Sequence, residues 1–277
     1  MEDSMVELLK AVFFGIVEGI TEWLPISSTG HLILLNEFIS LDVSESFFSM
    51  FEVVIQLGAI LAVVLLFWKE IWPFSVKEKY CVKQDTFVMW FKIVVACIPA
   101  AVVELAFGDK IEDLFYNYFV IALALIVFGV AFILIENGNR RKRPKMEAIA
   151  EIGWDTAFWI GMFQLIAAVF PGTSRSGATI LGGILLGVSR SVAAEFTFFL
   201  AIPVMFGASL MKVLDFGFVF TTSELVILLI GMATAFLVSV VVIRFLMGYI
   251  KKHDFKVFGW YRIVLGVLVL FYFTMLR

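Results

Sequence analysis

The sequence predicts an all-α integral membrane protein with six transmembrane helices and two re-entrant helical hairpins in an inverted-topology repeat. Three observations predict this fold: an apolar composition, apolar runs long enough to cross a bilayer, and a motif that occurs twice. Of the 277 residues, 62% are hydrophobic and 16% are charged, and the mean hydropathy is +1.01. These values exclude an ordinary soluble domain. We expect one membrane domain, residues 1–277, with repeat halves of about 1–138 and 147–277.

An apolar helix that carries two acids and then breaks begins the first half. Residues 15–31 read GIVEGITEWLPISSTGH. Glu18 and Glu22 lie one turn apart on the same helix face, and Pro25 ends the helix. Neither side of the break is long enough for a comfortable span, so we expect a hairpin that enters the membrane and returns, shielded by protein.

Hydroxyl side chains and a histidine follow this break. Ser27, Ser28 and Thr29 occur in succession, although one hydroxyl suffices to cap the next helix. His31 lies three residues beyond Ser28, so on a continuing helix the two side chains share a face. The pattern therefore places a base within reach of a possible nucleophile.

The same pattern returns at residues 161–177, GMFQLIAAVFPGTSRSG. A shift of 146 positions aligns Gly15 with Gly161, Glu18 with Gln164, Pro25 with Pro171, Ser27 with Thr173, and Ser28 with Ser174. Where the first copy has Thr29 and His31, the second has Arg175 and Gly177. The chain is therefore interpreted as a duplicated unit with one acid-and-histidine half and one arginine half.

The second break is suited to binding an anion. The backbone N–H groups after Pro171 and Gly172 point at one spot, and Arg175 can hold a phosphate through two parallel hydrogen bonds. The hydroxyl groups beside it are further candidates for phosphate binding: Ser27 and Thr29 in the first motif, and Thr173, Ser174 and Ser176 in the second. A structural ion pair between Arg175 and one of the two acids is the alternative, and the two roles can coexist.

Glu18 and Glu22 are costly side chains in a membrane. A charge near the bilayer centre costs about 2.5–3.5 kcal/mol, and two like charges on one turn repel unless a cation or a shared proton relieves them. We predict a divalent-metal site at Glu18 and Glu22, or one metal ligand and one general base. A structural pair that lines a wet cavity is the alternative.

Six apolar runs reach the length of about 20 residues that a transmembrane helix needs. They lie at about 50–68, 86–107, 117–136, 195–213, 223–247 and 258–275. Each half then holds one hairpin and three spans, and an odd number of crossings inverts the second half relative to the first. The ionisable residues Lys92, Glu104, Arg244 and Arg262 within these runs are interpreted as snorkelling or structural.

Basic residues outside the predicted spans fall into two groups. The larger group comprises Lys69, Lys77, Lys79, Lys83, Arg140, Arg141, Lys142, Arg143, Lys145, Arg190, Lys251, Lys252 and Lys256. The smaller group comprises Lys10, Lys110, Lys212 and Arg277. The positive-inside rule places the larger group in the cytoplasm and both termini outside, although two fully spanning hairpins would give nearly the same bias.

Three further observations limit the function. The first helix is not interpreted as a cleavable signal peptide, because it contains Glu7, Glu18 and Glu22 and lacks a small-residue cleavage site. The two cysteines, Cys81 and Cys97, form no metal or redox motif. The formal net charge of −3 gives no indication of nucleic-acid binding.

The motifs EGITEWLPISSTGH and PGTSRSGAT resemble the two signature motifs of bacterial undecaprenyl-diphosphate phosphatases of the bacitracin-resistance type. The resemblance extends along essentially the whole chain, including FEVVIQLGAILAVV at 51–64. It implies a hydrolase of the bacterial cell membrane that converts undecaprenyl diphosphate to undecaprenyl phosphate and inorganic phosphate. The monophosphate returns to peptidoglycan synthesis as lipid carrier, and bacitracin acts only indirectly, by sequestering the diphosphate.

The resemblance also implies which residues form the site. Its active-site positions are Glu18, Glu22, Ser28, Thr29, His31, Ser174 and Arg175, with Mg²⁺ or Ca²⁺ as cofactor. It further implies an active site that opens to the extracytoplasmic side.

Two hypotheses follow for the function. In a hydrolase, Ser28 attacks the terminal phosphorus while His31 or Glu22 acts on protons, and His31 as the nucleophile stays open. In a transporter or flippase for a lipid phosphate or anion, the same inverted repeat and anion site would suffice. The row of hydroxyls beside two acids and a histidine favours the hydrolase. Whether the chain forms a homo-oligomer is left open.

Overall fold

The computed structural model describes residues 2–75, 82–140 and 142–275. Lys77, Lys79, Cys81, Arg141 and Arg277, which the sequence analysis names, lie outside the described residues. Within the described residues the regular elements are helices, joined by loops that contain two isolated β-bridges. The elements of the first half are α1 (Glu2–Thr21), α2 (Ser28–Phe38), α3 (Glu45–Val54), α4 (Gln56–Leu66), α5 (Trp68–Ile71), α6 (Gln84–Phe115) and α7 (Tyr118–Asn139). Those of the second half are the 3₁₀ turn η1 (Ile149–Glu151), α8 (Trp154–Val169), α9 (Arg175–Leu185), α10 (Arg190–Phe216), α11 (Thr222–Tyr249) and α12 (Lys256–Met275).

The described part of the chain contains six helical segments that are long and apolar enough to cross a membrane. They are Glu45–Leu66, which combines α3 and α4, and the single helices α6, α7, α10, α11 and α12. This confirms the six predicted spans and the all-α fold of a multi-pass membrane protein. The largest difference is in α6, which continues to Phe115, beyond the predicted end at residue 107.

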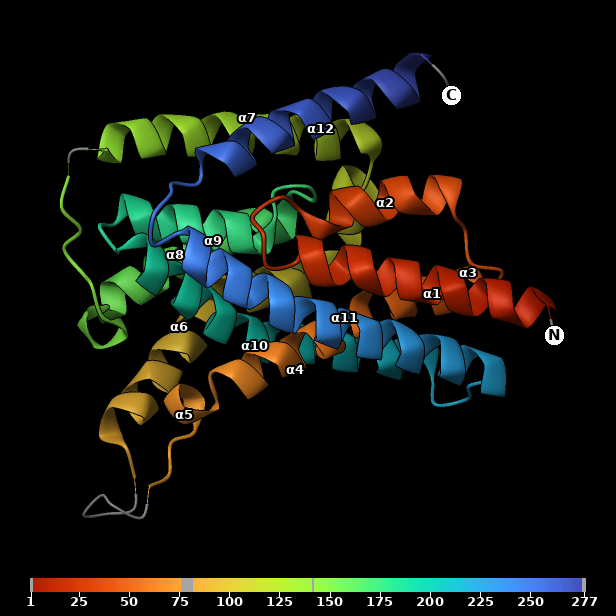
Figure 1. Cartoon of the computed structure of the whole chain (residues 1–277), viewed down its shortest axis with the longest axis horizontal. Helices are drawn as coiled ribbons and strands as arrows, with labels where there is room; N and C mark the ends of the chain where they lie inside the picture. Colours follow the sequence, from red (N-terminus) through yellow and green to blue (C-terminus); the bar gives the residue numbers. More distant parts are fainter. Residues whose placement is uncertain (1, 76–81, 141, 276–277) are drawn as a thin grey trace.

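Each repeat half contains a helix–break–helix hairpin before its three long helices. In Figure 1, α1 runs inward from the N-terminal end, the chain turns near the middle of the long axis, and α2 returns. The α8–α9 hairpin begins at the opposite end of the molecule and also turns in the interior. The two breaks therefore come together inside the helix bundle. That the hairpins are re-entrant within a membrane stays a prediction.

The two repeat halves interleave. The first hairpin helix α1 packs along α11 of the second half, and α8 packs along α6 of the first half. A glycine allows the close approach in each case: a Cβ atom on Gly15 would lie 2.6 Å from the carbonyl oxygen of Gly231, and one on Gly161 would lie 2.3 Å from that of Ala96. Each hairpin is thus positioned by the other half, and the third spans α7 and α12 pack against each other.

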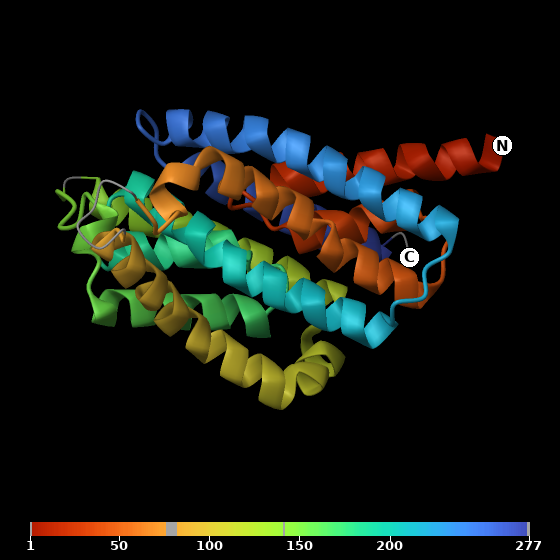
Figure 2. The ribbon, with the colours of Figure 1, turned by 90° about the horizontal axis from the view of Figure 1, so that it is seen from below.

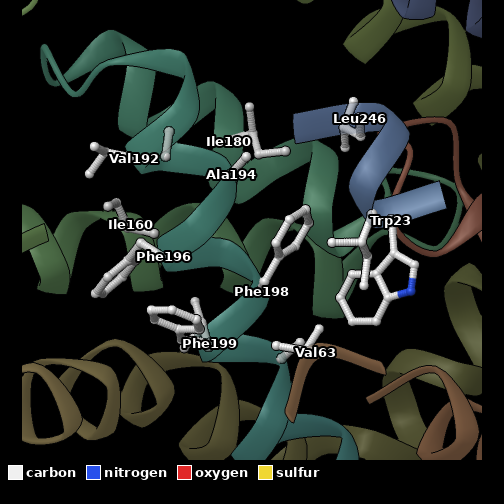
Figure 3. Packing of buried hydrophobic residues seen from close by; sticks show 14 of the residues in the cluster. Trp23, Val63, Ile160, Ile180, Val192, Ala194, Phe196, Phe198, Phe199 and Leu246 are labelled. Carbon is white, nitrogen blue, oxygen red and sulfur yellow. The ribbon is translucent and has the colours of Figure 1, made fainter. Parts of the chain in front are cut away.

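The main hydrophobic core fixes the first break at the centre of the molecule. Trp23, directly after α1, is fully buried and packs edge-on against Phe198 of α10, with ring centroids 5.2 Å apart (Figure 3). Large aromatic side chains contribute a large share of the apolar area that a core buries. The loop between α1 and α2 is therefore anchored by packing and not by its backbone alone.

The loops gather at two ends of the molecule. Figures 1 and 2 show the connector 140–153 and the α9–α10 and α11–α12 loops at one end, and both chain ends with the α10–α11 loop at the other. The described members of the larger basic group lie in loops or helix ends at the connector end, as the charge pattern predicts. The side of the membrane that each end faces stays a prediction.

Cysteine labelling tests this topology. In a background with Cys81→Ser and Cys97→Ser, we expect Lys110→Cys to react with a membrane-impermeant maleimide in intact cells. Arg143→Cys should react only after the membrane is permeabilised, because both side chains are exposed but belong to opposite ends. Labelling of both positions from the same side would contradict the inverted arrangement.

Candidate active site

Both returning helices begin at a serine with an unusual backbone conformation. Ser27 has φ 77° and Ser174 has φ 68°, and these are the only non-glycine residues with positive φ in the described ranges. The Ser27 Oγ accepts a hydrogen bond from the N–H of Gly30 at 3.4 Å, and the Ser174 Oγ accepts one from Gly177 at 3.1 Å. Strain of this kind is of order 1–3 kcal/mol per residue and concentrates at functional sites. The two serines are equivalent N-caps.

This equivalence corrects the alignment of the two motifs. Ser27 corresponds to Ser174, so the predicted pairing of Ser28 with Ser174 is wrong. Between the proline and the capping serine the second motif has two residues, Gly172 and Thr173, where the first has only Ile26, so the shift is 146 positions at the proline and 147 from the capping serine onward. Ser28 and Arg175 therefore occupy the same place, as the first residue of each returning helix.

Glu22 connects the two breaks. The Ser28 Oγ donates a hydrogen bond to Glu22 Oε2 at 2.8 Å, and Arg175 Nη2 forms an ion pair with Glu22 Oε1, also at 2.8 Å. The Ser176 Oγ donates to the backbone carbonyl of Glu22 at 2.9 Å. Because Glu22 is buried, these contacts compensate the cost of removing its charge from water. One carboxylate thus contacts both the candidate nucleophile and the candidate phosphate ligand.

Arg175 is held in place but keeps part of its binding capacity. Its Nη1 donates to the Thr197 carbonyl of α10 at 3.2 Å, while its Nε has no hydrogen-bond partner within the described residues. The Arg175 side chain is 14% exposed. The predicted alternatives, a carboxylate pair and a phosphate ligand, are therefore compatible: the Glu22 pair orients a guanidinium group that can also bind phosphate.

Two helix N-termini contribute backbone donors at the same place. The N–H groups of Ser28 and Thr29 in α2, and of Arg175 and Ser176 in α9, donate to no partner in the described hydrogen bonds. Unpaired N–H groups in the first turn, together with the helix dipole, favour an anion. The interior site therefore combines four backbone donors with one arginine.

The predicted site residues differ in their exposure to solvent. Ser28, Thr29, His31, Ser174 and Arg175 are partly exposed, and Thr29 forms a hydrogen bond with the Tyr116 side chain. In contrast, Ser27, Thr173, Ser176 and Gly172 are buried. Their contacts are structural: Ser27 is a cap, and Ser176 fixes the Glu22 backbone.

Gly172 is required by the shape of the second break. Its φ is 90°, and a Cβ atom there would lie 2.5 Å from the Ile121 carbonyl oxygen of α7. Thr173 beside it is fully buried, and its hydroxyl has no hydrogen-bond partner in the described part of the chain. Phosphate binding by Gly172 and Thr173 stays a prediction.

His31 is held away from Ser28. Its Nδ1 donates to the Ser27 carbonyl at 2.7 Å, because a carbonyl oxygen can only accept. Its Nε2 lies 2.7 Å from the Tyr261 hydroxyl of α12, and this hydroxyl donates to it when the ring is neutral. No hydrogen bond among the described residues joins His31 to Ser28. The base that contacts Ser28 in this structure is Glu22.

Arg262 of α12 joins the two breaks. It is fully buried; its Nη1 donates to the Pro25 carbonyl at 3.2 Å, and its Nη2 donates to the Gly172 and Thr173 carbonyls at 3.0 and 2.7 Å. The guanidinium group thus satisfies carbonyl groups of both interrupted helices, which would otherwise be buried without partners. This contact sets the spacing between the two motifs.

Comparison with known proteins agrees with this geometry. Residues 11–268 match the family described as bacitracin resistance protein BacA. The chain belongs to this family. It is 66% identical to an undecaprenyl-diphosphatase of Desulfitobacterium hafniense, over 98% of each chain. It is 64% identical to one of Lachnoclostridium phytofermentans (99% of this chain and 100% of the relative) and 63% identical to undecaprenyl-diphosphatase 1 of Clostridium acetobutylicum (97% and 98%). The family resemblance of the two motifs is confirmed.

The BacA-family site fits a metal ion only in part. No group of three or more His, Cys, Asp and Glu side chains in the described residues could enclose one. However, both carboxylate oxygens of Glu18 are buried and have no hydrogen-bond partner among the residues that the structure describes, so Glu18 is either neutral or balanced by a bound cation. One or two carboxylates with substrate phosphate oxygens and water are a typical Mg²⁺ donor set, whereas Ca²⁺ takes six to eight oxygen ligands. Mg²⁺ or Ca²⁺ at Glu18 and Glu22 stays a prediction.

The sequence analysis did not place Arg262 or Tyr261 at this site. Their signal was present, because an ionisable residue inside an apolar span is a functional candidate by default. Of the two interpretations of Arg262, snorkelling and structural, its burial and its contacts with three carbonyl groups confirm the structural one. Its partners lie 237 and 90 positions away in the sequence, at Pro25 and Gly172, and only the folded chain shows them.

Proposed function

We propose that this BacA-family protein is an undecaprenyl-diphosphatase, which hydrolyses undecaprenyl diphosphate to undecaprenyl phosphate and inorganic phosphate. The observation that carries the proposal is the position of Glu22, 2.8 Å from both the Ser28 hydroxyl and the Arg175 guanidinium group. These contacts support a mechanism in which Ser28 is the nucleophile, Glu22 its base and Arg175 a phosphate ligand. The activity of the relatives, 63–66% identical over nearly the whole chain, supports it.

The proposed chemistry begins at Ser28. The Glu22 carboxylate takes the hydroxyl proton while the Ser28 Oγ forms a bond to the terminal phosphorus, and the bond from that phosphorus to the bridging oxygen breaks. Undecaprenyl phosphate leaves, and water then cleaves the phosphoserine to release inorganic phosphate and restore Ser28. Arg175 and the free N–H groups of α2 and α9 hold the phosphate oxygens and stabilise their developing charge.

Two further groups support this reaction. A divalent cation at Glu18 and Glu22 would, when bound, neutralise charge on the diphosphate. His31 moves protons near the leaving group through its bond to the Tyr261 hydroxyl. As a nucleophile, His31 would first have to break that bond, which makes it the less favoured candidate.

The cellular setting of this activity is part of the proposal. The protein acts in the bacterial cell membrane, with the site open to the extracytoplasmic side. The product returns to peptidoglycan synthesis as lipid carrier, and recycling of the diphosphate confers bacitracin resistance.

Purified protein in detergent tests the proposed function. With undecaprenyl diphosphate and Mg²⁺ we expect steady release of inorganic phosphate, and undecaprenyl phosphate should accumulate in equal amount. A folded preparation that binds the lipid but releases no phosphate would favour the transporter alternative and overturn the proposal.

Arg262→Lys should lower kcat by about 10²-fold with a smaller change in KM, because misplacing the catalytic groups by about 1 Å costs that much. A lysine cannot donate to three carbonyl groups of two loops at once. Arg244→Lys, which changes an exposed arginine of α11, is the matched control and should keep the wild-type kcat. Steady-state kinetics of the two variants measure the difference, and equal kcat values would refute the positioning role of Arg262.

A further inference from the structure

A polar cavity lies at the connector end of the molecule, away from the two breaks. Its volume is about 440 Å³. Three segments line it: Asn139 with residues 142–145 of the connector, the α9–α10 turn at 184–191, and Ile250 with Lys251 at the end of α11. Figure 1 shows these segments together at one end, and none of the lining residues belongs to either break. The active-site chemistry therefore does not account for this cavity.

Basic side chains line the cavity, and none of its described lining residues carries a carboxylate. Arg190 forms an ion pair with Glu136: its Nε donates to Glu136 Oε1 at 2.9 Å and to Oε2 at 3.1 Å. The other four basic residues form no ion pair within the described part of the chain: Lys142, Arg143, Lys145 and Lys251. The cavity thus concentrates uncompensated positive charge.

Two other lysines at the same end of the molecule do have partners. Lys83 Nζ donates to the Lys69 carbonyl at 2.6 Å, and Lys256 pairs with Asp254 at 3.0 Å. The positive-inside rule explains an excess of basic residues at this end. It does not require four unpaired ones around a single cavity.

The backbone adds donors to the same cavity. Helix α10, 27 residues long, begins at Arg190 in the cavity wall, and the Ser189 Oγ caps it by accepting from Val192 N. The N–H groups of Arg190 and Ser191 have no partner in the described hydrogen bonds. The positive end of a long helix dipole therefore faces the same space as the unpaired basic side chains.

The cavity is also rigidly built. Lys145 N donates to the Gly187 carbonyl at 2.7 Å, and Ser189 N donates to the Met146 carbonyl at 2.8 Å. The aliphatic stem of Lys145 lies against Gly187, where a Cβ atom would be 3.3 Å from it. The connector and the α9–α10 turn are thus fastened together, so the basic groups are held in position before any ligand arrives.

We propose that this cavity binds the phosphate group of an anionic phospholipid from the adjacent leaflet. The basic side chains suit a phosphate group. A lipid site also needs an apolar surface, and Leu185, which borders the cavity and is 50% exposed, supplies one. Basic pockets between transmembrane helices on the cytoplasmic side are typical sites for anionic lipid headgroups. The ligand is a resident membrane lipid, and the proposal does not depend on the catalytic function.

Binding to full-length protein in detergent tests this proposal with three probes: short-chain phosphatidylglycerol, phosphatidylcholine and inorganic phosphate. We expect phosphatidylglycerol to raise the unfolding temperature of the wild type and the other two probes to have little effect. In Lys142→Gln/Lys251→Gln the phosphatidylglycerol dissociation constant should rise on the order of 10-fold or more, since each basic residue contributes about 1 kcal/mol. Lys69→Gln/Lys252→Gln removes the same charge at the same end but outside the cavity and should bind as the wild type does.

Three binding results would overturn the proposal. Equal weakening in both double variants would mean diffuse surface charge, and a cavity-dependent effect of inorganic phosphate would identify a free anion as the ligand. No selectivity for phosphatidylglycerol would exclude a headgroup site. If the first double variant does not fold, Arg143→Gln, which changes an exposed side chain, replaces it with the same criteria.

Discussion

Glu22→Gln should lower the rate of phosphate release by about 10³-fold while the protein still folds, because general-base help is worth about 10²–10⁴-fold. Glutamine keeps the size of the side chain, but it cannot take the Ser28 proton and it leaves Arg175 without its ion-pair partner. The loss should appear in kcat more than in KM, since the base acts in the transition state.

Glu136→Gln is the matched control for this prediction. Glu136 is a buried carboxylate paired with an arginine, Arg190, but it belongs to the connector end of the molecule. Its replacement should lower the unfolding temperature and leave kcat of the folded enzyme close to that of the wild type. If Glu22→Gln also loses only stability, Glu22 is structural and the proposed base is wrong.

Ser28→Ala should reduce phosphate release to the background rate, because it removes the atom that forms the bond to phosphorus. The Ser28 side chain is partly exposed, so its loss leaves no large buried cavity. Ser239→Ala is the control: this buried hydroxyl donates to the Gly19 carbonyl of α1 at 3.4 Å, and its loss should affect stability but not turnover. A Ser28→Ala enzyme with a tenth or more of the wild-type rate would contradict the assignment.

The sequence alone predicts most of the architecture, and the reasons are physical. Long apolar runs identify the six spans, and a proline followed by hydroxyl residues identifies each break. These signals are local, so they do not depend on the rest of the fold. The alignment beyond the prolines was wrong because the second motif has one more residue between its proline and its capping serine, which an ungapped shift does not detect. The capping hydrogen bonds of Ser27 and Ser174 identify the equivalent positions.

The partners of the site residues could be predicted only where few candidates existed. The pairing of Arg175 with one of two acids was among the alternatives, and the structure selects Glu22. The Tyr261 hydroxyl that contacts His31 lies 230 positions away, on a helix that no local pattern assigns to the site. Helical spacing predicts that His31 lies near Ser28. In the structure the His31 ring instead donates a hydrogen bond to the backbone carbonyl of Ser27, the N-cap residue of α2.

Single-turnover hydrolysis by Ser28→Ala and His31→Ala, measured side by side with the purified proteins, tests the central claim most directly. With Ser28 as nucleophile and Glu22 as its base, Ser28→Ala should be inactive, whereas His31→Ala should keep measurable activity, because a group that only moves protons is worth about 10²–10⁴-fold. Acid-quenched wild-type enzyme with labelled substrate should carry phosphate on Ser28. An inactive His31→Ala beside a slow but active Ser28→Ala, with the label on His31, would contradict this assignment.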